Sequence, residues 1–155
     1  MSPQVWIAVI VGVAASAQDL LRRRISNWIP AVALAAGLGY HTFAGGWRGA
    51  LTALAGAAGG FAVFLVFYLL GGMGGGDVKL MAGFGAILGA GRLLEAALWT
   101  AAVGGLVAAV VVAWSAVRRR SSRGDGTTRP APRAESIPYA PAITAGAWLA
   151  LIPKG

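Results

Sequence analysis

The sequence predicts an all-α protein, a polytopic membrane helix bundle with about six transmembrane helices. Hydrophobic residues make up 57% of the chain and charged residues only 12%, which is far from the composition of an ordinary soluble domain. Long apolar runs recur down the chain, as membrane-spanning helices require. Many of the residues in these runs are Ala and Gly, whose small side chains let membrane helices approach one another closely.

Six apolar segments account for the expected helices. In chain order they are residues 3–21, 28–43, 50–70, 78–90, 93–117 and 139–152. The first, third and fifth segments reach the roughly 20 residues that a span needs, and the other three are short. We therefore expect residues 1–155 to form one integral membrane domain. Residues 118–138 are rich in Arg, Ser, Thr and Pro, and they are predicted to form a flexible basic cytoplasmic loop within it.

The distribution of basic residues predicts the orientation. If the N-terminus lies outside, ten of the 13 Lys and Arg residues fall on the cytoplasmic side, and only Arg48, Arg92 and Lys154 fall outside. The opposite orientation would invert this ratio, against the preference of basic residues for cytoplasmic loops. The net charge of +8 is thus explained by membrane anchoring beside the lipid bilayer, and no nucleic-acid partner is expected.

Two aspartates are the candidate functional residues. Asp19 ends the first apolar segment and Asp77 precedes the fourth, so this topology places both carboxylates on the cytoplasmic side at one depth. Charge near a bilayer costs roughly 2.5–3.5 kcal/mol at a helix centre, and it usually marks function. Two neighbouring carboxylates share a proton, so one can deprotonate a water molecule while the other protonates a carbonyl oxygen. Asp19 and Asp77 are therefore the predicted catalytic pair for peptide-bond hydrolysis.

Simpler structural roles remain open for these residues. Asp19 could pair with Arg22 or Arg23 one helical turn away, and Asp77 could cap the N-terminus of the fourth helix. Lys79 either anchors that helix at the headgroups or tunes the pKa of Asp77.

The glycines before Asp77 also allow two interpretations. Gly74, Gly75 and Gly76 form a predicted substrate-binding loop, because glycine permits unusual backbone angles and adds no side-chain bulk. The alternative is a plain flexible turn. The chain has no cysteine, and His41 is its only histidine. We therefore expect neither a metal site nor a cofactor.

Three segments resemble the type IV prepilin peptidase family. The run Gly74-Gly75-Gly76-Asp77-Val78-Lys79-Leu80 is similar to its Gly-x-Gly-Asp-x-Lys-Leu motif, and residues 19–27 are similar to its other aspartate segment, with Ser26 where the family often has Pro. Residues 137–142 resemble the start of its last helix. The closest similarity is to the small members of tight-adherence (Flp-type) pilus systems, which lack the cysteine-containing domain linked to N-methyltransferase activity.

The resemblance implies a GxGD-type membrane aspartic endopeptidase of the bacterial inner membrane. Its substrates would be prepilin-like proteins with a basic leader and an apolar helix, cleaved at the cytoplasmic face, and Asp19 and Asp77 would be its catalytic residues. The competing interpretation is a non-enzymatic membrane component of a pilus or secretion apparatus, or a small transporter whose carboxylates bind protons or cations.

Overall fold

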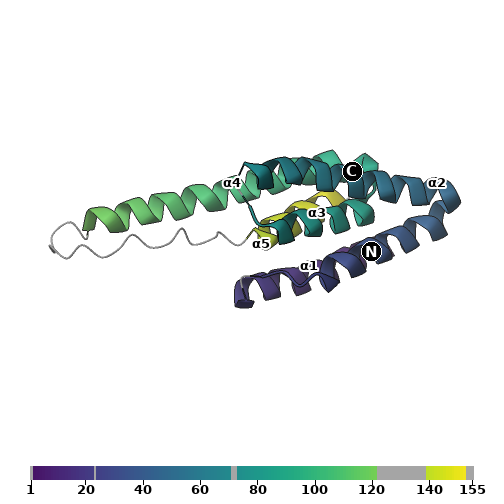
Figure 1. Ribbon diagram of the computed structural model, residues 1–155, viewed down its shortest axis with the longest axis horizontal. Helices are drawn as coiled ribbons and strands as arrows, with labels where there is room; N and C mark the ends of the chain where they lie inside the picture. The colour runs from purple at the N-terminus through teal and green to yellow at the C-terminus, as the bar shows by residue number, and fades with distance from the viewer. Residues whose placement is uncertain (1, 23, 71–72, 122–138, 153–155) are drawn as a thin grey trace.

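The computed structural model describes residues 2–22, 24–70, 73–121 and 139–152. Five helices make up these residues: α1 (Pro3–Arg22), α2 (Trp28–Leu69), α3 (Gly75–Leu88), α4 (Ala90–Ser121) and α5 (Ala140–Leu151). No strand occurs in the described ranges. The prediction of an all-α bundle is therefore confirmed (Figure 1).

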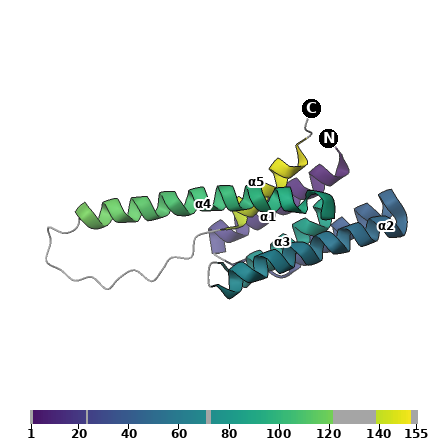
Figure 2. The ribbon, with the colours of Figure 1, turned by 90° about the horizontal axis from the view of Figure 1, so that it is seen from above.

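Helix α2 is a hairpin of two helical arms. Its backbone leaves helical geometry at Gly45 (φ −136°, ψ 15°) and Gly46 (φ 57°, ψ −141°). The chain reverses direction there, and the second arm returns along the bundle (Figure 2). A positive φ with this ψ is a conformation that essentially only glycine adopts. The apolar segments predicted at 28–43 and 50–70 correspond to these two arms.

Length and composition identify three helices that could cross a membrane, namely α1, α2 and the Ala90–Val107 part of α4. Large apolar side chains cover the outside of the molecule, including Leu21, which is 83% exposed, and Phe43, which is 96% exposed. Such a surface would be unfavourable in water and suits contact with lipid chains. The molecule is thus a membrane helix bundle.

Helix α3 lies at the centre of the bundle and packs mainly against α2. After Lys79 it is apolar on all sides, as expected for a helix enclosed by others, and Leu80, Met81, Phe84 and Ile87 are fully buried. The backbones of α2 and α3 come so close that a Cβ at Gly56 would overlap the carbonyl oxygen of Gly85. Glycine at this crossing allows α3 to pack deeply into the bundle.

One predicted boundary is wrong. The sequence placed Arg118–Arg120 in the flexible loop, whereas helix α4 continues to Ser121. Arginine is a good helix former, so a run of arginines can extend a helix whose end is not packed against other helices. The rest of the predicted basic loop, residues 122–138, lies outside the described residues.

The helices alternate in direction and therefore divide their termini between two ends of the bundle. The C-terminal end of α1 and the N-terminal ends of α3 and α5 lie together at one end, which we call the aspartate end (Figures 1 and 2). The α2 hairpin, the α3–α4 turn, the N-terminal end of α1 and the C-terminal end of α5 lie at the other, which we call the terminal end. Helix α4 extends past the bundle at the aspartate end.

Candidate active site

Asp19 and Asp77 line the same pocket at the aspartate end. The pocket has a volume of about 240 Å³, and its other lining residues are Arg24, Ile25, Gly74 and Gly76. Each aspartate is only 8% exposed. The structure therefore brings together two buried carboxylates that are separated by 58 positions in the sequence, as the predicted topology requires.

Asp19 is held by a hydrogen bond to a distant helix. Its Oδ2 atom accepts a hydrogen bond of 3.1 Å from the backbone N–H of Ala140, the first residue of α5. A helix N-terminus has unpaired N–H groups and a partial positive charge, so a carboxylate is favourable there. This contact fixes Asp19 against α5. Arg22, one of the two predicted ion-pair partners, is exposed, and Arg23 lies outside the described residues.

Asp77 caps the helix that carries it. Its Oδ2 atom accepts a hydrogen bond of 3.2 Å from the backbone N–H of Gly74, the N-cap residue of α3. Its Oδ1 atom is buried and has no hydrogen-bond partner within the described residues. Asp77 therefore does cap the N-terminus of α3, as one of the two interpretations of the sequence predicted, but only its Oδ2 atom takes part. A buried polar atom without a partner is costly, which makes Oδ1 suited to bind water or substrate.

The pKa of the Asp77 carboxyl is raised to about 6, mainly because the group is buried and also because the Asp19 charge lies nearby, while the hydrogen bond from Gly74 opposes the shift. Asp77 stands ahead of the apolar run that begins at Val78 and outside the three candidate spans. A carboxyl with this pKa can carry a proton near neutral pH, as a general acid must.

The glycines beside Asp77 serve close packing and not unusual backbone angles. Gly74 is extended, with a φ of −81° that any residue can adopt, and Gly75 and Gly76 begin α3. A Cβ at Gly76 would lie 3.2 Å from Ile25 Cβ, and one at Gly74 would lie 3.3 Å from Asp77 Oδ2. The expectation of special backbone geometry at these residues is thus wrong, while the need for small side chains has a structural basis.

Lys79 points to a neighbouring helix. Its Nζ atom donates a hydrogen bond of 3.0 Å to Asn27 Oδ1, which links α3 to the start of α2 at an exposed position. Among the described residues, the groups that shift the pKa of Asp77 are Asp19 and Gly74, and Lys79 is not one of them.

Two lining residues were missed by sequence reasoning. Arg24 was interpreted only as part of a basic anchor, and Ile25 only as part of a motif, yet both line the pocket. Their position in the sequence could have indicated this role, because both residues follow α1 in a short turn that must pass beside Asp19. In the described ranges no three residues of the types His, Cys, Asp and Glu lie close enough together to hold a metal ion.

The fold and the site together define a membrane helix bundle with two buried aspartates in one pocket. Residues 6–110, which include both aspartates, match the model of the type IV leader peptidase family. The chain belongs to this family, which confirms the family that its sequence resembles.

Part of the chain is also similar to a curated protein. Over 101 residues the chain is 35% identical to "Prepilin leader peptidase/N-methyltransferase" of Bacillus subtilis (strain 168). The match covers 64% of this chain and 35% of that protein, so the chain matches about a third of the relative's length. No solved structure matches the chain significantly.

Proposed function

We propose that this protein is a membrane aspartic endopeptidase that removes the leader peptide of prepilin-like substrates by activating water between Asp19 and Asp77. The observation that carries the proposal is the shared pocket of about 240 Å³ at one end of the bundle. Family membership supports the reaction class, and the printed name of the Bacillus subtilis relative suggests the substrate class.

The two carboxylates have different surroundings, which suggests different roles. Asp77 has the raised pKa, so it would carry the shared proton and donate it to the scissile carbonyl oxygen. Asp19 would accept a proton from the water molecule as that water attacks the carbonyl carbon. When the tetrahedral intermediate collapses, Asp19 gives the proton that it took from water to the leaving nitrogen, and the C–N bond breaks. The hydroxyl formed on the carbonyl oxygen returns its proton to Asp77 as the carbonyl re-forms. These steps use only the two carboxylates and water.

The position of the pocket also supports the proposed topology. The bundle would cross the bacterial inner membrane in about six passes, with its N-terminus outside and the aspartate end at the cytoplasmic face. Arg118–Arg120 lie on the part of α4 that extends from this end, in agreement with the preference of basic residues for the cytoplasm. A carboxylate pair at one end of the bundle favours a peptidase over a transporter, whose ion site is expected near the bilayer midplane.

Cleavage of a co-expressed substrate tests the proposal. The substrate is a prepilin-like protein with a basic leader that ends in Gly, and leader removal is measured by mass spectrometry. Asp19→Asn and Asp77→Asn should each slow cleavage by roughly 100-fold or more, because Asn cannot exchange the proton. Asp125→Asn makes the same chemical change in residues 122–138 and should cleave normally. Near-normal cleavage by either pocket variant at equal membrane abundance would contradict the role of that aspartate.

A further inference from the structure

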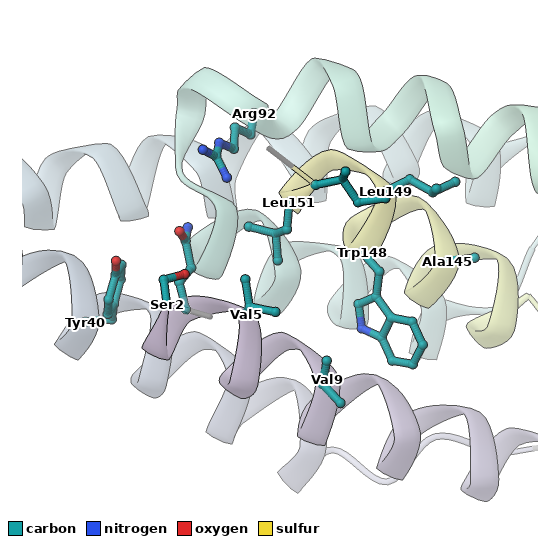
Figure 3. Close-up of a pocket in the computed structure, with 11 residues that line it drawn as sticks. Ser2, Val5, Val9, Tyr40, Arg92, Ala145, Trp148, Leu149 and Leu151 are labelled. Carbon is teal, nitrogen blue, oxygen red and sulfur yellow. The ribbon is translucent and has the colours of Figure 1, made fainter. Parts of the chain in front are cut away.

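A second pocket, larger than the one that holds the aspartates, lies at the terminal end. It has a volume of about 850 Å³ and lies between the starts of α1 and α4, the first arm of α2, and α5 (Figure 3). This volume falls in the range of roughly 300–1,000 Å³ that is typical of small-molecule sites. Nothing in the proposed peptidase reaction uses this pocket.

The pocket is polar at one end and apolar at the other. Arg92, Ser2 and Tyr40 gather at one end, whereas Val9, Ala145 and Trp148 lie further along the helices (Figure 3). Because α1 runs from the terminal end toward the aspartates, the apolar part of the pocket points into the middle of the bundle. A membrane lipid has the same polarity, with its headgroup at the bilayer surface and its chains toward the centre.

Arg92 supplies the charge at the polar end. It is the one charged side chain among the described lining residues, and it is exposed. Two other polar lining residues already stabilise helix packing: Gln4 Nε2 donates to the carbonyl oxygen of Ile87 at 2.6 Å, and Trp148 Nε1 donates to that of Ala8 at 3.0 Å. The positive charge of Arg92 is therefore the main feature of this end that can select a ligand.

We propose that this pocket binds an anionic phospholipid, whose phosphate is held by Arg92 and whose acyl chain lies along Val9, Ala145 and Trp148. A planar guanidinium forms strong paired hydrogen bonds with phosphate oxygens. No carboxylate occurs among the described lining residues. The positive charge of Arg92 attracts the phosphate and repels the ammonium group of a zwitterionic headgroup, which favours a net-negative lipid such as phosphatidylglycerol.

Native mass spectrometry of the detergent-purified full chain tests this site. Phosphatidylglycerol or phosphatidylethanolamine is added in equal amounts, and the fraction of protein with bound lipid is measured. Arg92→Gln should weaken phosphatidylglycerol binding on the order of tenfold, because a charge-assisted hydrogen bond is lost. The matched control is Arg48→Gln. Arg48 is an exposed arginine of α2 that does not line the pocket, and its substitution should leave binding unchanged.

A second variant tests the apolar part separately. Ala145→Phe would fill the pocket beside Trp148, and it should lower binding of a long-chain phosphatidylglycerol more than binding of its six-carbon-chain form. Glycerol phosphate, which has no acyl chain, should fail to displace the lipid.

Three results would overturn the proposal. The first is equal phosphatidylglycerol binding by Arg92→Gln and Arg48→Gln. The second is equal binding of the two lipids by the parent protein. The third is displacement by glycerol phosphate alone, which would show a phosphate site without lipid specificity.

Discussion

The two ends of the bundle hold pockets of opposite character. At the aspartate end, a pocket of about 240 Å³ contains two buried carboxylates. The Asp19 carboxylate is tied to α5 and the Asp77 carboxylate to the N-cap of α3. At the terminal end, a pocket of about 850 Å³ is lined mostly by apolar side chains and one exposed arginine. The carboxylates of the first pocket are held in place by hydrogen bonds. The second pocket is an open space between helices, and most of the side chains around it are apolar.

This difference separates two requirements. Acid–base chemistry needs reacting groups held in place, because small displacements cost large factors in rate. Lipid binding needs volume, apolar surface and a single charge. Pro3 and Asp19 lie at opposite ends of α1, roughly 24 Å apart at 1.5 Å per residue, and sites further apart than 7–10 Å generally behave independently. Changes at one end should therefore leave the other end unaffected.

Gly76→Val should give the largest effect among changes that retain both aspartates. The new side chain would press on Ile25, whose Cβ lies 3.2 Å from the position of a Cβ at Gly76, and it would displace the first turn of α3 with Asp77. A shift of about 1 Å can reduce the rate on the order of 100-fold. The measurement is the initial rate of leader removal at equal membrane abundance, together with phosphatidylglycerol binding, which should not change.

Gly75→Ala is the matched control for this prediction. A Cβ at Gly75 would lie 3.6 Å from the Tyr68 ring, an ordinary contact, so cleavage should stay within about a factor of two of the parent rate. If Gly76→Val cleaves as fast as Gly75→Ala, the packing around Asp77 does not position the carboxylate.

The pH dependence of cleavage tests the unequal roles of the aspartates. The pKa of Asp77 is raised to about 6, so its carboxyl is mostly protonated below pH 6 and mostly ionised above it. If Asp77 is the acid, the cleavage rate should fall as pH rises through 6, by roughly tenfold per pH unit at higher pH. Lys79→Met should leave the midpoint unchanged, because Lys79 bonds to Asn27. A rate that rises through pH 6 would make Asp77 the base.

The sequence was sufficient to place the two aspartates at one end of the bundle. Each apolar run reverses the direction of the chain, so counting runs between Asp19 and Asp77 gives their relative position without any knowledge of packing. The paired arms of α2 follow in the same way, because two apolar segments flank Gly45 and Gly46. Helix boundaries were less certain, since Arg118–Arg120 suit both a basic loop and the end of α4.

Contacts between distant segments could not be predicted from local patterns. The hydrogen bond from Ala140 to Asp19 joins residues 121 positions apart, and it depends on how α1 and α5 pack. The lipid-sized pocket is a space left by that packing, so its lining residues share no motif. The same holds for Gly56 and Gly85, whose close approach is hidden among many similar glycines.

Gly46→Ala should give the smallest effect on cleavage and a clear effect on stability. Gly46 has a φ of 57° and a ψ of −141°, and holding a residue other than glycine in this conformation costs about 2 kcal/mol. Gly45→Ala is the matched control, because its φ of −136° is accessible to alanine, and at neither position would an added Cβ meet another atom within 4 Å. The two variants thus differ mainly in backbone strain. Thermal unfolding in detergent, followed by circular dichroism, should give a lower Tm for Gly46→Ala than for Gly45→Ala. Both should cleave substrate at the parent rate, because the hairpin lies at the end of the bundle opposite Asp19 and Asp77. A loss of cleavage in Gly46→Ala at equal membrane abundance would show that the two ends of the bundle are coupled.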